Sequence, residues 1–283
     1  MLAAVELLPG RVRAALLDLS GTVLRRAESV FDPTAQDRTG IDAALTEVTQ
    51  GWRDAGPVGV GVAAVGIVDA DVGVVVEVNE VPALRGYPLA DTLAGLVHAP
   101  VHVEHRARLQ VLGDRWFGPG QGRSTFASVS TGEVLGVGIL HDGRVLAPPG
   151  GRSGAHMKVS AGGEVCTCGA LGCWKTIATT AWLRAEARRR GLTEMDGDIM
   201  DGELLDDYAG NIALGLVNIQ QLFAPGLFVL HGEAAGERFR TRIEERLRAD
   251  SPSGAEPPRV LVNDNPVDDI ALLGGAGLVL SRQ

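Results

Sequence analysis

Short apolar runs alternate with turn residues over the first third of the chain, a pattern typical of β-strands. The turns at Pro9-Gly10 and Ser20-Gly21 separate the first runs and predict an antiparallel start. The expected strands cover residues 3–8, 12–19, 23–28, 58–65, 74–78 and 101–104. Apolar residues at helical spacing predict helices over 41–52 and 89–96. Together these elements predict a first α/β lobe over residues 1–105.

The rest of the chain shows the same mixture of periods. Helices are expected over 107–116, 179–190, 208–222 and 270–280, and strands over 125–129, 136–140, 227–231 and 260–262. They predict a second α/β lobe over 106–267 with a cysteine loop at 156–173, and a closing helix over 268–283 that packs back on the first lobe. The 38 glycines agree with the tight turns of an α/β protein.

Charge and hydropathy exclude several classes of protein. The 26 basic and 35 acidic residues give a net charge of −9, which disfavours a free-standing nucleic-acid binder. No apolar run approaches the roughly 18 residues that cross a bilayer, and the N-terminus lacks a basic signal segment. We therefore expect a cytoplasmic protein without membrane contact.

All three cysteines lie in one short segment, close to a histidine. His156, Cys166, Cys168 and Cys173 give the spacing His-x9-Cys-x-Cys-x4-Cys, three thiolates and an imidazole. This is the ligand set of a closed tetrahedral zinc site, and because protein would fill all four positions, we expect the zinc to be structural. The alternative is a chance cluster of cysteines beside a histidine.

The same segment resembles the zinc-binding signature of the ROK family, which contains sugar-responsive repressors and sugar kinases. The segments 58–69, 118–122 and 139–143 also fall in the family's order. The resemblance implies an α/β fold with two lobes, actin-like and ribonuclease-H-like, and a homodimer.

Three elements that hold ATP in the family's kinases are altered in this sequence. Where the family has Asp-x-Gly-Gly-Thr, this chain reads Glu6-Leu-Leu-Pro-Gly10, and Pro9 has no N–H for a phosphate. In the second element Glu133 replaces a hydroxyl and would repel ATP. The third element, a Gly-Gly pair, reads His231-Gly232.

The catalytic and sugar-binding positions implied by the resemblance are altered as well. Arg106 stands where the family's Asp removes a proton from the sugar, and a guanidinium cannot act as that base. The remaining ligand-binding positions fall on His105, Ser153, His156 and Lys175. These residues, with Arg108 or Arg152 beside them, favour an anionic sugar or sugar phosphate. In the alternative, Arg106 pairs with Glu104 or Asp114.

We therefore expect no catalytic residue and a regulator-type, non-catalytic ROK protein that senses a sugar or sugar derivative. The first family strand begins at residue 3, which leaves no room for a DNA-binding domain, so we expect no direct nucleic-acid binding. The cluster Arg184, Arg188, Arg189 and Arg190 is interpreted as a solvated helix end. The alternatives are a sugar kinase with a displaced base, for which Glu104 is the candidate, and an assembly protein without a small ligand.

Overall fold

The structure is a computed structural model that describes residues 1–147, 153–192, 202–232, 236–251, 256–263, 265 and 267–283. It divides into two compact units. The first comprises Met1–Gln121, Ala147–Gly151 and Asn265–Gln283, and the second comprises Gly122–Leu146 and Arg152–Asp264. The expected boundary between residues 105 and 106 differs from this division, because helix α4 (Arg106–Phe117) packs on elements of the first unit.

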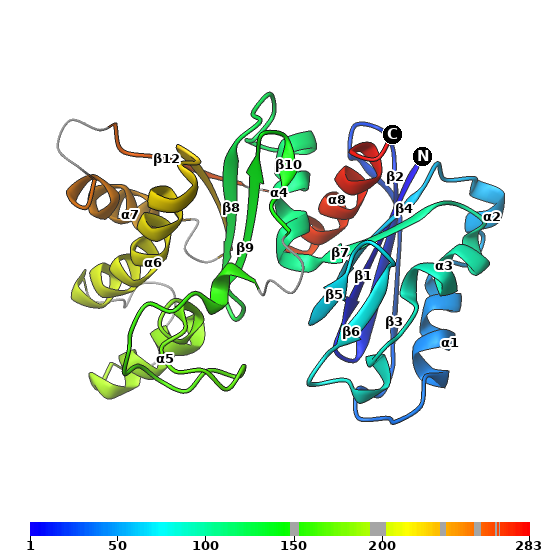
Figure 1. Ribbon diagram of the computed structural model, residues 1–283, viewed down its shortest axis with the longest axis horizontal. Helices are drawn as coiled ribbons and strands as arrows, with labels where there is room; N and C mark the ends of the chain where they lie inside the picture. The colour runs from blue at the N-terminus through cyan, green and yellow to red at the C-terminus, as the bar shows by residue number, and fades with distance from the viewer. Residues whose placement is uncertain (148–152, 193–201, 233–235, 252–255, 264, 266) are drawn as a thin grey trace. The chain divides into compact units, whose positions relative to one another are not determined.

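A five-stranded mixed sheet forms the centre of the first unit (Figure 1). Its order is β3 (Val23–Val30), β2 (Arg11–Leu17), β1 (Leu2–Leu8), β4 (Val60–Ala64), β7 (Val101–His105). The pairs β3–β2 and β2–β1 are antiparallel, whereas β1–β4 and β4–β7 are parallel. The hairpin start and the parallel continuation agree with the predicted α/β class.

Helices cover both faces of this sheet, which explains why β1 is buried from Leu2 to Leu7. One face carries α1 (Thr39–Val48), α2 (Trp52–Ala55) and α3 (Leu89–Val97), and the other carries α4 and α8 (Val267–Leu280) (Figure 1). Side chains alternate between the two cores, so that Val5 joins the first and Ala4 the second. A small sheet of β5 (Ile67–Asp69) and β6 (Val74–Glu77) completes the unit with the 3₁₀ turn Pro82–Leu84.

Helix α8 lies unusually close to its neighbours because glycines line the contact. A Cβ atom on Gly61 of β4 would stand 1.9 Å from the carbonyl oxygen of Gly275. A Cβ on Gly274 would stand 2.5 Å from the carbonyl oxygen of Leu109 in α4. The missing side chains therefore let backbone pack on backbone, and α8 buries the apolar face of β1 and β4.

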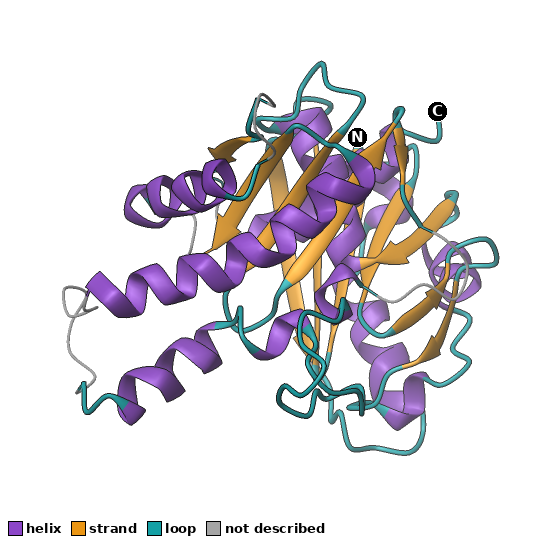
Figure 2. Ribbon diagram, turned by 60° about the vertical axis from the view of Figure 1, so that its left-hand side comes forward, coloured by secondary structure: helices purple, strands orange, loops and turns teal. Residues whose placement is uncertain are grey.

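The second unit repeats the strand order of the first. Its sheet runs β10 (Arg144–Val145), β9 (Gly136–His141), β8 (Phe126–Thr131), β11 (Leu227–Gly232), β12 (Arg259–Val262). The helices are α5 (Thr180–Arg189), α6 (Gly202–Phe223) and α7 (Glu237–Ala249), with 3₁₀ turns at Gly154–His156 and Trp174–Thr176. They gather on one side of the strands (Figure 2) and bury a core that includes Phe228, Tyr208 and Ile243.

Most predicted elements are confirmed, with local differences that have physical reasons. The helix expected over 41–52 ends at Val48, because Gly51 adopts φ +80° and starts the separate turn α2. Helix α6 begins six residues before the expected start at Tyr208. Helix α7 and strands β5 and β10 were not predicted, although Phe239, Ile243 and Leu247 have helical spacing. Among the described residues, no helix is both long and apolar enough to cross a bilayer.

The close packing of α8 predicts a large cost for a single methyl group. Gly61→Ala should destabilise the chain by about 3 kcal/mol or more, because the contacting atoms belong to backbone and have little room to move. Gly95→Ala is the matched control in helix α3, where nothing lies within 4 Å of the new Cβ. It should stabilise the chain by about 0.5 to 1 kcal/mol. Urea unfolding checks both values, and equal effects would contradict the packing argument.

Candidate functional site

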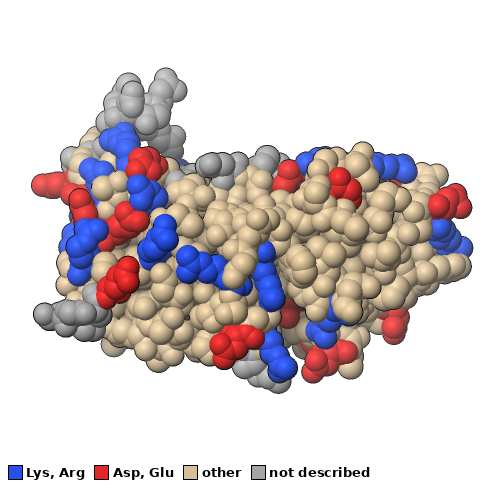
Figure 3. Space-filling view, turned by 90° about the horizontal axis from the view of Figure 1, so that it is seen from above, with Lys and Arg blue, Asp and Glu red and all other residues tan. Residues whose placement is uncertain are grey.

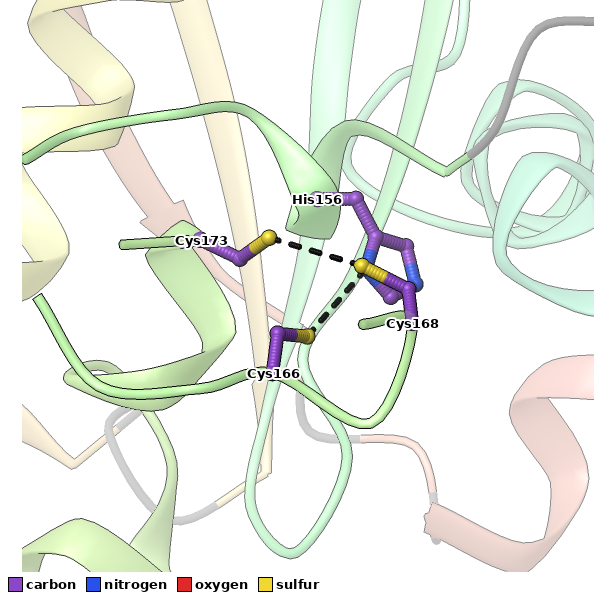
Figure 4. A group of neighbouring side chains, drawn as sticks. All are labelled: His156, Cys166, Cys168 and Cys173. Atoms are coloured by element: carbon purple, nitrogen blue, oxygen red, sulfur yellow. Dashed lines mark hydrogen bonds between the residues drawn. The ribbon is translucent and has the colours of Figure 1, made fainter. Parts of the chain in front are cut away.

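Three cysteines and one histidine of the second unit converge on one point (Figure 4). The Sγ of Cys166 lies 3.5 Å from Nδ1 of His156, and the Sγ atoms of Cys168 and Cys173 lie 3.7 Å apart. Around a tetrahedral zinc, bond lengths of about 2.3 Å to sulfur and about 2.0 Å to nitrogen place sulfurs about 3.8 Å apart and sulfur and nitrogen about 3.5 Å apart. The predicted ligands therefore form a Cys3His group with the dimensions of one tetrahedral metal site.

The loop that carries these residues is held by its own backbone. The N–H of Cys166 donates to the carbonyl of Ala170, and the N–H of Gly172 donates to that of Glu164. Gly172 has φ +68°, and a Cβ there would stand 2.0 Å from the carbonyl oxygen of Ser160. Only glycine fits this position, so Gly172 is the residue that permits the tight turn bringing Cys168 back beside Cys173.

The chemistry of the donor set also fits a cation. Cys173 is 1% exposed, and this burial together with its hydrogen bonds with Cys168 and Cys166 raises the pKa of its thiol to about 12. The buried Cys173 thiol would therefore hold its proton in the absence of a positive charge. A divalent ion removes that obstacle because it stabilises the thiolate directly.

The residue after the last cysteine joins the metal loop to the core. Trp174 is fully buried, and its indole N–H donates to the carbonyl oxygen of Asn211 in α6 over 2.8 Å. The indole packs against Gly215 one turn further along, where a Cβ would stand 2.1 Å from the ring. The backbone N–H of Trp174 donates to the carbonyl of Met157, next to His156. The metal loop is therefore attached to the longest helix of its unit.

Three of the predicted ligand-binding residues lie around this loop. His156 is a member of the metal cluster, and Ser153 precedes it by three residues, with its hydroxyl accepting from the N–H of Ala155. Lys175 follows Trp174 and donates from Nζ to the Thr167 hydroxyl over 3.3 Å. The turns that hold Ser153 and Lys175 contact one another, so the structure gathers this group within the second unit. Arg152 lies outside the described residues.

The other two predicted residues stand at the start of α4 in the first unit. His105 is the N-cap, and its Nδ1 accepts from the N–H of Ala107 over 3.3 Å. The buried carboxylate of Glu104 accepts from the N–H of His105 over 2.7 Å and from Arg108 over 3.2 Å. Glu104 and Arg108 therefore satisfy each other one helical turn apart.

Arg106 is paired with a carboxylate from a distant part of the chain. Its Nε donates to Oε1 of Glu6 over 2.5 Å, and Arg13 donates from Nη1 to Oε2 of the same carboxylate over 3.3 Å. The Glu6 side chain is fully buried, whereas those of Arg106 and Arg13 are 25% and 13% exposed. Each oxygen of a buried anion thus has its own guanidinium donor, the arrangement that a buried charge requires.

The expectation that Arg106 pairs with Glu104 or Asp114 is therefore wrong. In the register of the sheet Glu6 lies opposite Ala63, and Ala63 lies opposite Glu104. The short side chain of Ala63 leaves room for Arg106 to reach Glu6, while Arg108 occupies Glu104. The sequence does contain a signal for Glu6, because it is the one charged residue of the otherwise apolar strand β1.

Carboxylates also surround the arginine cluster of α5. Arg184 donates to Glu133, and this hydrogen bond lowers the pKa of the Glu133 carboxyl. Hydrogen bonds from Arg189 and Arg190 lower the pKa of Glu186 to about 2. On the face that Figure 3 shows, basic and acidic side chains are also interspersed. The paired charges around Arg184, Arg189 and Arg190 agree with the interpretation of this cluster as a solvated helix end.

Comparison with known sequences gives two kinds of relative. The chain is 29% identical over 191 residues to a glucokinase of Halalkalibacterium halodurans, covering 65% of this chain and 57% of the relative. It is 26% identical over 235 residues to the xylose repressor of Bacillus subtilis, covering 77% and 60% respectively. The chain thus spans less than two thirds of the length of these curated relatives.

Solved structures match over nearly the whole chain. A ROK family glucokinase from Streptomyces griseus, in complex with glucose and AMPPNP, superposes with a TM-score of 0.76 at 25% identity and covers 98% of both chains. A ROK family transcriptional regulator, a homologue of E. coli MLC, gives 0.81 at 22% identity and covers 98% of this chain and 77% of the other. The two-lobed actin-like fold is confirmed. With the ROK family profile matching residues 3–281, the chain belongs to the ROK family.

Proposed function

We propose that this chain is a non-catalytic, regulator-type ROK protein whose ligand is a sugar or sugar derivative. The observation that carries the proposal is the ion pair between Arg106 and the buried Glu6. Arg106 stands where the family resemblance places the catalytic base, and a guanidinium with a pKa above about 12 does not take up a proton. The pair fixes this guanidinium where proton transfer would be needed.

Glu104, the carboxylate two residues before that position, is also engaged in hydrogen bonds. Glu104 holds Arg108 and the backbone N–H of His105, so a proton taken from a sugar would weaken both hydrogen bonds. This argues against the runner-up, a sugar kinase with Glu104 as a displaced base. The sugar kinase alternative is supported by the similarity to the glucokinase of Halalkalibacterium halodurans and to an N-acetylmannosamine kinase of Salmonella arizonae.

The proposed phosphate contacts support the same conclusion. Pro9 offers no N–H at the turn after β1, and Glu133 brings a carboxylate to the loop after β8. Glu133 is 62% exposed and paired with Arg184, which keeps it ionised. A triphosphate would meet a missing donor in one unit and an added negative charge in the other.

We assign the metal of the Cys3His cluster to zinc, in a structural role. Its four protein ligands leave no position for a substrate or water, and thiolate ligands with one imidazole favour zinc over harder cations. When bound, the zinc would cross-link the loop at His156 to the segment at Cys173, and so fix Lys175. Cysteines held as thiolates are typical of a reducing compartment, which supports a cytoplasmic location.

For the ligand we retain His105, Arg106, Ser153, His156 and Lys175 as proposed contacts. An anionic ligand, expected from the sequence, needs available cations. The pairing with Glu6 supports the alternative for Arg106, in which the protein's own carboxylate neutralises it. Lys175 has an uncharged partner, the Thr167 hydroxyl, so an anionic sugar derivative would be held by Lys175 instead.

The proposal predicts no ATP hydrolysis and no sugar phosphorylation above background. A coupled assay across glucose, xylose and N-acetylmannosamine measures turnover, and thermal shift with the same sugars measures binding. A binding sugar at about 100 times its Kd should stabilise the chain by about 2.7 kcal/mol. Robust turnover that is lost in Glu104→Gln would establish the kinase alternative. If the chain shows no turnover and no thermal shift with any sugar or sugar phosphate, the result would favour an assembly protein without a small ligand.

The zinc assignment predicts one zinc per chain, measured by metal analysis of protein purified without chelators. Cys168→Ser should lose the metal and destabilise the chain by about 4 kcal/mol or more, because a structural site contributes its binding energy to folding. Thr167→Ser is the matched control, since it changes the adjacent loop residue but keeps the four ligands and the hydroxyl beside Lys175. Wild-type protein with far less than one zinc would refute the assignment.

The buried ion pair predicts a contrast between two glutamates that both bind Arg13. Glu6→Gln should cost about 3 to 5 kcal/mol, because it leaves two guanidinium groups without their buried anion. Glu28→Gln should cost about 1 kcal/mol or less, because Glu28 is 48% exposed and water replaces its pairing. Urea unfolding at low salt compares the two, and equal costs would sink the idea that Glu6 is the essential partner.

A further inference from the structure

The carboxylate of Glu6 holds its two arginines in the way that a bound anion would. Its Oε1 accepts from Arg106 Nε over 2.5 Å, and its Oε2 accepts from Arg13 Nη1 over 3.3 Å. Each of the two carboxylate oxygens therefore accepts a hydrogen bond from one charged donor. A phosphate offers the same kind of acceptor oxygens to the same kind of donors. The protein thus supplies an anion from its own chain at this point.

The surroundings show that Glu6 is needed for charge balance there. Arg13 also donates from Nε to Glu28 on β3, over 3.3 Å, but Glu28 lies at the surface. With Glu6 present, the buried part of this ion cluster holds one negative and two positive charges. Removal of the Glu6 charge would leave Arg106 and Arg13 without the buried anion that they share. An anion from solution would then be attracted to the vacated position.

We propose that Glu6 determines ligand class at the start of α4, because its buried carboxylate occupies Arg106 and Arg13 and so excludes phosphate and other anions there. A neutral hydroxyl group does not need a free guanidinium, so this position favours the unphosphorylated form of a sugar over its phosphate. The inference rests on the proposed function for its meaning, since it assigns a ligand preference to one of the proposed contacts. The charged residues involved all belong to the first unit.

Inorganic phosphate is the probe that tests this assignment. Wild-type protein, Glu6→Gln and Glu6→Asp are titrated with phosphate and, at matched ionic strength, with chloride, and the melting temperature is recorded. Wild type should show no saturable shift specific to phosphate. Glu6→Gln should gain one, with affinity for phosphate at least about tenfold above wild type, because the isosteric amide removes the charge and keeps the volume. Glu6→Asp keeps the charge and should behave as wild type.

A double variant identifies the donors. Glu6→Gln combined with Arg106→Ala should lose the phosphate response that Glu6→Gln gains. Should Glu6→Gln not fold in chloride, the inference requires that phosphate restore its folding, followed by circular dichroism, while chloride at the same ionic strength does not. Absence of that rescue, or a folded Glu6→Gln without a phosphate response, overturns the inference. So does saturable phosphate binding by wild type that Arg106→Ala abolishes.

These outcomes are separate from those of the activity assay. Turnover of ATP with a sugar by wild type would overturn the proposed function without bearing on whether Glu6→Gln gains phosphate. A failed gain of phosphate, with no turnover by wild type, would overturn the role of Glu6 and leave the non-catalytic assignment in place. Phosphate binding and turnover are therefore measured on the same preparations.

Discussion

A carboxylate inside a protein needs charged donors on its oxygens, and Glu6 meets this requirement with arginines from two other segments. The carboxylate lies on β1, the first strand of the central sheet; Arg13 comes from the hairpin partner β2, and Arg106 from the start of α4. The interaction therefore connects the antiparallel half of the first unit to the end of its parallel half. The orientation of α4, the position of Arg106 and the charge presented at that point all follow from it.

In the second unit, the loop of the Cys3His cluster needs a different kind of stabilisation. This metal loop has few apolar side chains to bury, and Val165 and Leu171 remain exposed. The four candidate metal ligands would take the place of the missing core, and Trp174 connects this loop to α6. The proposed ligand contacts of this unit, Ser153 and Lys175, lie on the two segments that a bound metal would join. Their spacing would then depend on the metal, whereas the positions of His105 and Arg106 depend on a helix cap and an ion pair.

The sequence predicted most of the fold because its apolar periods are strong. Except for β10, the strands of the two five-stranded sheets follow from local patterns, and the candidate metal ligands follow from their spacing, which the glycines at 169 and 172 reinforce. The partner of Arg106 did not follow, because Glu6 lies 100 residues away and the two meet only through the register of three strands. Nor did sequence reasoning show that the two sheets share one strand order, since that similarity lies in hydrogen-bond topology and is carried by different residues.

The glycine-lined seat of α8 has a consequence for how the chain folds during synthesis. Helix α8 follows the second unit in the sequence, yet it covers strands that lie within residues 2–64. Until α8 is synthesised, the part of the apolar face of β1 and β4 that it covers stays open, while the second unit is already available to fold. Domains usually fold as units in the order of their synthesis, but here the first unit is completed only after the second. Its unfinished face is the surface that a nascent-chain chaperone would meet.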